Sequence, residues 1–293
     1  MLNGHHVVLS AFGSSAGIYV VSMAKMALVE RVTSLPSTGF DFVKRRWAVV
    51  KRLDPTESED AVVLAGTRRK QTSEIRIQSA PDAHAVMIRG SSMFVVSSYR
   101  ATVQQFNLRS KSLGGSHSFG GDVDQWHPND LCEINGDVWA SFFADPSQGA
   151  SWKEDPAERG FLMNLHTGER LGKFTFLHSP TPRPEGIYVC DSGTSSLVLI
   201  DRQGVELRRR ELSGFTRGLL VEDRYVVVGV STHRLAAKAS PGASESRLHV
   251  LDRATLKEIA VIDVPSTEIY QVGMASPWHV RQLRRLKVGS DVG

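Results

Sequence analysis

Three histidines recur at matching places along the chain, namely His84, His127 and His178. Each stands at or near the start of a stretch of alternating apolar residues, and a polar or Gly turn separates that stretch from a second apolar one. Imidazole nitrogens suit Zn, Fe and Mn, and three imidazoles leave coordination positions for a carboxylate and for water or substrate. The pattern therefore predicts a divalent metal site (Zn, Mn or Fe) with these three histidines as ligands.

Other chemically capable side chains occupy the starts of the same kind of stretch. They are Asn129, Asp130, Ser179, Thr216, Arg217, Glu268 and Tyr270. Glu268 or Asp130 could complete the metal shell or act as a general base, and the Arg217 guanidinium could clamp a carboxylate or phosphate with two hydrogen bonds. We predict catalytic roles for these three residues. The four uncharged residues of the set are predicted to bind substrate.

Two alternatives to a metal site stay open at this point. The histidines could line a metal-free polar pocket, or they could bond to water and backbone and only fill space. Arg217 could equally form a salt bridge with Glu268 or Asp130. The sequence has no G-x-S-x-G elbow, no P-loop and no G-x-G-x-x-G motif, so no nucleotide cofactor is expected. Cys132 and Cys190 lie among apolar neighbours, and we expect both to be inert.

A repeat positions these side chains. Five segments share a template of alternating apolar residues, a turn, an aromatic residue and a short apolar run. The aromatic residues recur roughly every 45 residues and are Trp47, Phe94, Trp139, Tyr188 and Tyr225. Each copy is typical of two short strands joined by a tight turn, and a second hairpin pattern follows most copies. Four strands in about 45 residues indicate one blade of a β-propeller.

The number of copies predicts how the propeller closes. Five copies cover about residues 38–264, which leaves a strand pattern at 6–32 and another at 268–275. Joined, these two make a sixth blade, and such a Velcro closure removes an open sheet edge. We therefore predict an all-β fold: one six-bladed propeller domain over residues 1–293, closed by N- and C-terminal strands. Helical patterns are nearly absent, so no helix is expected.

The propeller prediction explains why the candidate side chains would meet. The first strand of every blade lines the central channel, so residues at the starts of those strands converge on the axis. Two long polar loops, residues 144–159 and 232–246, fall between the second and third strands of their blades and thus on one face. Long loops in compact folds are often lids over a site, or simply mobile.

Composition limits the partners. The chain of 293 residues has 41% hydrophobic residues and a net charge of +4, with short, separated basic runs. Its apolar stretches are far shorter than the ~18 residues of a membrane helix, and no signal peptide pattern is present. Two cysteines fit a reducing compartment. We expect a cytoplasmic protein that binds neither membrane nor nucleic acid but a small-molecule ligand.

Several segments together resemble a family of bacterial conserved-hypothetical propellers described as a domain of unknown function. The segments are residues 126–139, 151–169, 178–201, 214–231 and 267–272, and the resemblance runs from about Ala83 to Val272. This resemblance implies a propeller without an established activity. More distantly, the chain is similar to the regucalcin, gluconolactonase and strictosidine synthase propellers, which work at a central channel.

Two classes of function follow from the predicted site. The first is an enzyme, dependent on a metal, that hydrolyses, eliminates from or epimerises a sugar-like compound or secondary metabolite at the channel. The second is a propeller that binds a small molecule or serves as a scaffold without catalysis. Convergent His, Arg and Glu residues favour the enzyme.

Overall fold

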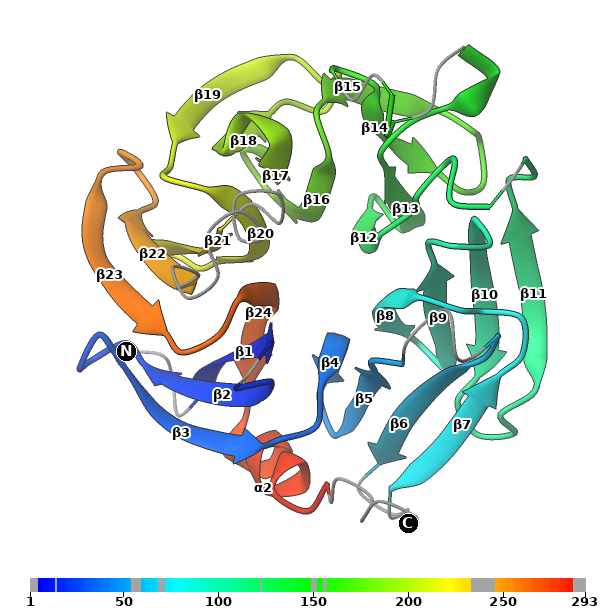
Figure 1. The fold of residues 1–293 in the computed structure, drawn as a ribbon, viewed down its shortest axis with the longest axis horizontal. Helices are drawn as coiled ribbons and strands as arrows, with labels where there is room; N and C mark the ends of the chain where they lie inside the picture. The colour runs from blue at the N-terminus through cyan, green and yellow to red at the C-terminus, as the bar shows by residue number, and fades with distance from the viewer. Residues whose placement is uncertain are drawn as a thin grey trace.

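A computed structural model gives the fold of this chain and describes residues 5–13, 15–53, 59–67, 72–121, 123–148, 152–154, 157–232 and 246–286. Six four-stranded antiparallel sheets stand in a ring around a central axis (Figure 1). The fold is therefore a six-bladed β-propeller, as the sequence predicted. We number the blades 1 to 6 in the order of the chain, beginning with β4.

Each blade is a meander whose first strand is nearest the axis. Blade 1 consists of β4 (Ser37–Val43), β5 (Arg46–Lys51), β6 (Ala61–Thr67) and β7 (Ser73–Ile77). Blade 2 consists of β8 (Ala83–Arg89), β9 (Ser92–Ser97), β10 (Thr102–Asn107) and β11 (Leu113–Ser118). Blade 3 consists of β12 (Asp130–Ile134), β13 (Asp137–Phe142), β14 (Gly160–Asn164) and β15 (Arg170–Phe174).

The remaining blades follow the same plan. Blade 4 consists of β16 (Leu177–Arg183), β17 (Gly186–Asp191), β18 (Ser196–Ile200) and β19 (Glu206–Glu211). Blade 5 consists of β20 (Phe215–Val221), β21 (Tyr225–Ser231), β22 (Ser246–Asp252) and β23 (Glu258–Val264). Blade 6 consists of β24 (Glu268–Ala275), β1 (His6–Phe12), β2 (Gly17–Ser22) and β3 (Ala27–Thr33).

Blade 6 closes the ring with strands from distant parts of the sequence. Strand β24 pairs antiparallel with β1, from His6 opposite Ala275 to Phe12 opposite Glu268. In Figure 1 the red-brown β24 lies between the axis and the dark blue β1. The predicted Velcro closure is confirmed, and it gives the inner edge of β1 a hydrogen-bonded partner.

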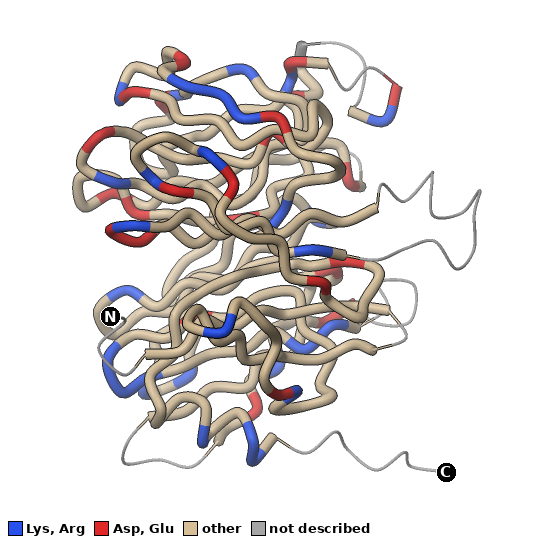
Figure 2. The backbone as a smooth tube through the Cα atoms, turned by 90° about the vertical axis from the view of Figure 1, so that its left-hand side faces the viewer, with Lys and Arg blue, Asp and Glu red and all other residues tan. Residues whose placement is uncertain are grey.

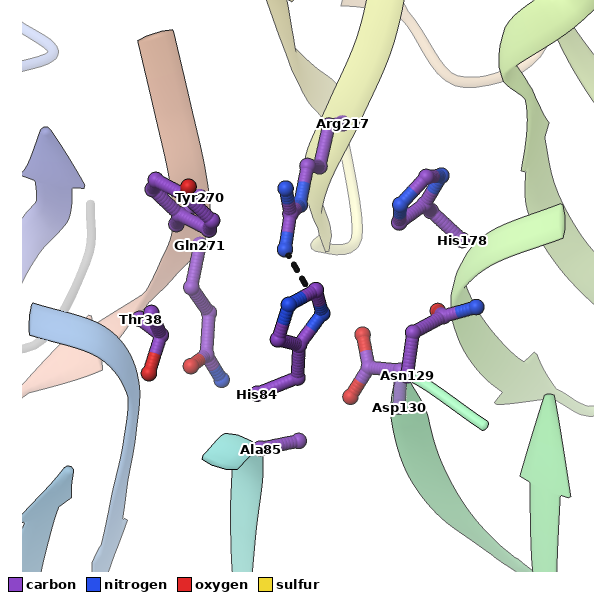
Figure 3. A pocket seen from close by; sticks show the side chains of 9 residues that line it. All are labelled: Thr38, His84, Ala85, Asn129, Asp130, His178, Arg217, Tyr270 and Gln271. Atoms are coloured by element: carbon purple, nitrogen blue, oxygen red, sulfur yellow. Dashed lines mark hydrogen bonds between the residues drawn. The ribbon is translucent and has the colours of Figure 1, made fainter. Parts of the chain in front are cut away.

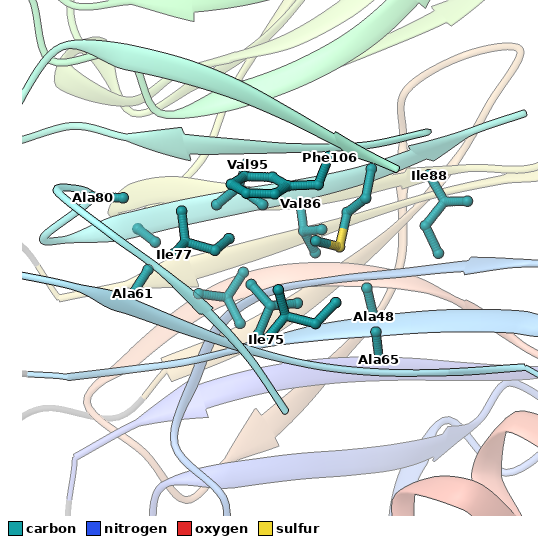
Figure 4. Packing of buried hydrophobic residues seen from close by; sticks show 14 residues of the cluster. Ala48, Ala61, Ala65, Ile75, Ile77, Ala80, Val86, Ile88, Val95 and Phe106 are labelled. Carbon is teal, nitrogen blue, oxygen red and sulfur yellow. The ribbon is translucent and has the colours of Figure 1, made fainter. Parts of the chain in front are cut away.

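The apolar core lies between neighbouring blades. Figure 4 shows one such layer, in which Ile75 and Ile77 of blade 1 face Val86 and Phe106 of blade 2. Four of the aromatic residues of the repeat are buried in these layers (Trp47, Phe94, Trp139 and Tyr188). Because side chains alternate between the two faces of each strand, every blade contributes to the layer on either side. The blades thus form a rigid frame around the channel.

One helix follows the ring, contrary to the expectation of none. Helix α2 (Pro277–Leu283) begins after Ser276, whose hydroxyl accepts a hydrogen bond from the His279 backbone N–H. Pro277 at the first position suits a helix start. Val280 and Leu283 pack into the layer between blades 6 and 1, which stabilises a helix too short to show a clear sequence pattern. Two short 3₁₀ helices, η1 (Pro146–Gln148) and η2 (Ser192–Thr194), lie in loops.

The two long loops occur where the sequence placed them, between the second and third strands of blades 3 and 5. Most of the 232–246 loop lies outside the described residues, whereas the 144–159 loop is partly described. Figure 2 shows Lys and Arg positions interspersed with Asp and Glu positions around the molecule. Among the described helices, none is both long and apolar enough to cross a membrane.

Candidate functional site

The pairing register defines two equivalent positions on the innermost strands. The first channel position holds Thr38, His84, Asn129, His178, Thr216 and Tyr270, one per blade. The second channel position is the next residue in each blade and holds Gly39, Ala85, Asp130, Ser179, Arg217 and Gln271. Together they form two tiers of side chains around the axis.

A cavity on the axis is lined entirely by residues of these two tiers. About 210 Å³ of space lies between and in front of its lining atoms, open solvent included, and the room for a water-sized group within it is about 10 Å³. Its lining residues are Thr38, His84, Ala85, Asn129, Asp130, His178, Arg217, Tyr270 and Gln271 (Figure 3). Six of these are predicted site residues. A cavity needs roughly 10–15 Å³ of such room to hold one water, so this one admits a single small polar group, such as one end of a ligand that extends outside it.

β-Bulges aim several of these side chains. Thr38, His84 and Tyr270 are each skipped in the register, because the residues on both sides of them pair with adjacent partners. In β16 and β20 two residues, beginning at Ser179 and at Arg217, oppose one. A bulge re-aims a side chain and is over-represented beside active sites. Five of the six innermost strands thus break their regular pairing at the cavity.

Arg217 provides the positive charge of the cavity. The residue is 7% exposed, and its guanidinium carbon lies 3.9 Å from the centre of the Tyr270 ring. One guanidinium nitrogen lies 3.3 Å from His84 Nδ1. A guanidinium over an aromatic face is attracted by the ring's electrons, and this attraction strengthens away from water. Burial is the main cause of the lowered pKa of both His84 and His178, and the Arg217 charge lowers both further.

His84 is part of a relay between a carboxylate and Arg217. Its Nε2 lies 3.2 Å from Asp82 Oδ2. We assign the ring proton to Nε2, because Arg217 can only donate and Nδ1 must accept. Burial lowers the pKa of His84 to about 4, although Asp82 acts in the opposite direction. His84 is thus neutral near pH 7 and holds Arg217 in position.

His178 has the opposite tautomer. Its Nδ1 lies 3.0 Å from the Phe176 carbonyl and 2.8 Å from the Ser192 hydroxyl. That hydroxyl donates to the Thr216 carbonyl, so both neighbours of Nδ1 accept and the ring proton belongs there. Burial, with a smaller effect of Arg217, lowers the pKa of His178 well below its usual value. The lone pair of Nε2 is therefore available on a ring that lines the cavity (Figure 3).

Asp130 carries a carboxyl that gains and loses its proton near neutral pH. Protein atoms surround the carboxyl, although part of the residue is exposed to the channel. Burial raises the pKa of Asp130 to about 6, against the opposing effects of the Leu131 N–H, the Arg217 charge and hydrogen bonds from Ser179. Ser179 is itself held, because its hydroxyl accepts the Gly218 backbone N–H at 3.0 Å. A carboxyl with this pKa suits proton transfer.

His127 does not occupy the position expected from the sequence. The register places Asn129 level with His84 and His178, and His127 stands two residues earlier with a left-handed φ of 46°. Its ring stacks on Phe143 at 4.2 Å between centroids, and its Nδ1 lies 2.5 Å from Asp124. His127 neighbours the His84 ring at 5.2 Å but does not line the cavity.

The other predicted residues have mixed positions. The Asn129 amide lines the cavity, yet it donates to the Leu177 carbonyl of blade 4 at 2.9 Å and accepts from Ser141. Thr216 and Ser179 stand at channel positions but lie outside the cavity lining, as does Glu268 at the start of β24. The sequence prediction missed Gln271, which follows Tyr270 and clamps both backbone polar groups of Phe40. In the sequence, the position of Gln271 directly after the predicted residue Tyr270 could have indicated it as a site residue.

The donor set bears on the predicted metal. Within the described ranges, no three His, Cys, Asp or Glu side chains gather in a way that could hold a metal ion. The Phe143 ring contacts both His127 and His178, and the Nδ1 of His84 faces Arg217. The three histidines are therefore neighbours in one region without a common centre. A metal ion at this site stays a prediction.

The fold and site define a six-bladed propeller with a polar cavity at its axis. In sequence, residues 121–276 match the family described as "Domain of unknown function (DUF4915)". This match covers more than half of the chain, and the chain belongs to that family. Among curated proteins none matches it.

Solved structures of other propellers are similar in fold. A protein of unknown function from Bacteroides caccae is 12% identical, with a TM-score of 0.62 over 92% of this chain and 98% of that one. A chain of a nidogen–laminin complex is 13% identical, with a TM-score of 0.61 over 93% and 98%. A provisionally assigned 6-phosphogluconolactonase from Bacteroides fragilis is 11% identical, with a TM-score of 0.59 over 94% and 99%. These likenesses establish the architecture alone.

Proposed function

We propose that this chain is an enzyme that converts a small anionic molecule, such as a sugar-derived carboxylate, by acid–base chemistry in the channel cavity. One observation carries the proposal: Arg217, His178 and Asp130 line the same cavity from three different blades. They supply a cation, a hydrogen-bond acceptor and a carboxyl that can take and return a proton.

The Arg217 side of the cavity favours an anion. Burial is the main cause of the lowered pKa of His178 and the Arg217 charge lowers it further, whereas at His84 the Asp82 carboxylate has a larger charge effect than Arg217 and opposes it. A carboxylate or phosphate near Arg217 would find a planar donor already oriented by Tyr270 and His84. Because blades on opposite sides hold these groups, little reorganisation would accompany binding.

The two remaining groups define the reaction class. Asp130, with a pKa of about 6 and therefore mostly ionised near pH 7, would take a proton from a carbon or from a water molecule next to the bound anion and return it to the leaving or neighbouring oxygen. The lowered pKa of His178 makes its imidazole a weak base, so its Nε2 would accept a hydrogen bond that orients the reacting group. Epimerisation, elimination and hydrolysis all need such a proton transfer, so we propose a hydrolase, lyase or isomerase of small carboxylated substrates.

The test combines turnover with binding. Purified protein is incubated in D₂O with 2-hydroxycarboxylates and carboxylated sugar lactones, and proton NMR follows exchange at carbon and ring opening. We expect conversion of at least one substrate, abolished in His178→Asn and Asp130→Asn. Binding of that substrate should persist in these two variants and weaken in Arg217→Gln. Unchanged turnover in His178→Asn and Asp130→Asn would overturn the proposed mechanism.

A metal-dependent form of the enzyme is a second candidate. The observation that favours it is the approach of His178 Nε2 and the Asp130 carboxyl to one cavity, since both are ligand types for Zn, Mn or Fe. Water or substrate would have to supply the remaining ligands. Elemental analysis before and after chelation decides: a bound metal whose loss stops turnover supports this form, and full turnover by metal-stripped protein refutes it.

Binding without conversion is the alternative class. It is favoured by the use of Thr38 and Asn129 in structural hydrogen bonds, to the Ala83 and Leu177 carbonyls of the next blade. A channel devoted partly to joining blades can still hold a ligand. Tight, Arg217-dependent binding of an anion without any turnover in the panel would establish this alternative.

A further inference from the structure

An aromatic cluster adjoins the cavity at the channel mouth. Phe143 lies 5.1 Å from Phe176 and 5.3 Å from Trp152 between ring centroids, and Trp152 lies 5.8 Å from Phe176. Phe176 in turn lies 6.4 Å from Phe215. We call these four residues the aromatic wall. Their rings come from blades 3, 4 and 5 and from the 144–159 loop.

His178 connects the aromatic wall to the cavity. The ring of His178 lines the cavity and also contacts Phe143 at 5.0 Å and Phe215 at 5.4 Å. The chain reinforces this connection, because Phe176 precedes His178 by two residues and Phe215 precedes Arg217 by two. The wall and the cavity side chains His178 and Arg217 therefore share their backbone supports.

The wall is only partly covered by the protein. Phe143 is buried, whereas Trp152, Phe176 and Phe215 each keep part of their surface exposed. The 144–159 loop is held here, since the Trp152 indole N–H donates to the Asp124 carbonyl at 2.7 Å and Lys153 pairs with the Asp124 carboxylate at 2.6 Å. Aromatic surface left exposed beside a polar cavity is typical of ligand sites.

We propose that the natural ligand carries a planar aromatic group, which rests on Phe176, Phe215 and Trp152 while its anionic end lies at Arg217. This inference rests on the proposed function and adds the substrate class, an aromatic carboxylate. The geometry supports it, because His178 borders both the cavity and the wall, and a cavity with room for about one small polar group leaves the ring of such a ligand to the adjoining wall. Stacked and edge-to-face ring pairs add to the affinity from buried area.

Competition binding tests the inference. 4-Fluorophenylacetate serves as a fluorine NMR reporter, and phenylacetate, cyclohexylacetate and acetate compete with it for the protein. We expect phenylacetate to compete at concentrations at least about threefold lower than cyclohexylacetate and at least about tenfold lower than acetate. Phe176→Leu and Trp152→Leu should abolish the preference for the aromatic ring over the cyclohexyl ring.

Trp278 on α2 offers a matched control. It is a partly exposed tryptophan outside the wall, so Trp278→Leu should keep the preference. Equal competition by phenylacetate and cyclohexylacetate, with loss of binding in Arg217→Gln, would refute the aromatic ligand and keep the anion site. A ring preference that survives both wall variants would also refute it. Failure of every carboxylate to bind would overturn the proposed function together with this inference.

Discussion

The guanidinium of Arg217 lies against the ring of Tyr270, with 3.9 Å between the guanidinium carbon and the ring centre, although the two residues belong to different blades. A second guanidinium, that of Arg52, donates to the Tyr270 hydroxyl at 2.7 Å. Tyr270 thus fixes the orientation of the cavity's cation. Affinity for an anion should depend on both residues, to different degrees.

Replacing Arg217 should weaken carboxylate binding more than replacing its support. We expect Arg217→Gln to raise the Kd for a bound carboxylate roughly 10- to 100-fold, because a charge-assisted hydrogen bond is lost. Tyr270→Leu should raise it only a few-fold, since the charge remains. Arg208→Gln on the exposed strand β19 serves as the control. Titration calorimetry measures all three, and equal Kd values for wild type and Arg217→Gln would refute the anion site.

Gly218 next to Arg217 should be intolerant of a side chain. Its φ is +79°, and an added Cβ would lie 3.1 Å from backbone atoms of Gln271. Gly168 has a similar φ of +76° with nothing within 4 Å, so Gly168→Ala isolates the backbone strain of about 1–2 kcal/mol. We expect Gly218→Ala to lower the free energy of unfolding by about 1–3 kcal/mol more than Gly168→Ala. Urea unfolding of both variants checks this, and equal losses would contradict it.

The raised pKa of Asp130 has a consequence for stability. The folded state keeps its proton up to about pH 6, whereas the unfolded chain releases it near 3.8. Stability present at low pH is therefore lost as pH rises from about 4 to 6. We expect the difference in unfolding free energy between Asp130→Asn and wild type to grow in favour of the variant by up to about 3 kcal/mol as the pH rises from 4 to 7.5. Urea titrations at the two pH values measure the gain, and a pH-independent difference would show an unperturbed carboxyl.

The lowered pKa of His178 acts in the opposite pH direction. Below about pH 6.5 the His178 imidazole binds a proton in the unfolded chain but not in the folded state, so the free energy of unfolding falls as pH decreases. His178→Asn retains a donor for the Phe176 carbonyl and removes the titrating group. When the pH is lowered from 7 to 5, the free energy of unfolding should fall less for His178→Asn than for wild type, and the difference should reach up to about 2 kcal/mol. His117→Asn, on the exposed strand β11, should lose as much as wild type.

Closure of the ring predicts what truncation does. Deleting residues 1–33 removes β1 to β3, which uncovers one edge of β24 and the apolar layers on both sides of blade 6. We expect the truncated chain to aggregate. A peptide of residues 1–33 added during refolding should restore soluble protein, as analytical ultracentrifugation can show. A soluble truncated monomer with an unchanged thermal midpoint would contradict the closure.

The repeat made the fold and much of the site predictable. Alternation, turns and recurring aromatic residues gave the blades, and the start of each innermost strand gave His84, Asp130 and Arg217 as cavity residues. This worked because a propeller brings equivalent positions to one axis. No knowledge of contacts was needed for that step.

Two of the errors concern the register of the innermost strands. The pairing register places Asn129, and not His127, level with the other histidines. The sequence already held this signal, because His84, Asn129 and His178 each precede the aromatic residue of their repeat by ten residues. Glu268 fell outside the cavity lining because the register places Tyr270, two residues later, level with the other channel residues. Helix α2 was missed because its stability comes from Val280 and Leu283 packing in a distant layer, which no local pattern shows.

The pairing of His6 with Ala275 also sets the order in which the molecule is completed during synthesis. Strand β1 leaves the ribosome before its inner partner β24 has been translated, and all of blades 1 to 5 come between them. At about 5–20 residues per second, the edge of β1 waits for roughly 10 to 60 seconds. During that time Tyr270 and Gln271 are also missing from the axis. The nascent chain therefore has no complete cavity, and ligand binding can begin only after the ring has closed.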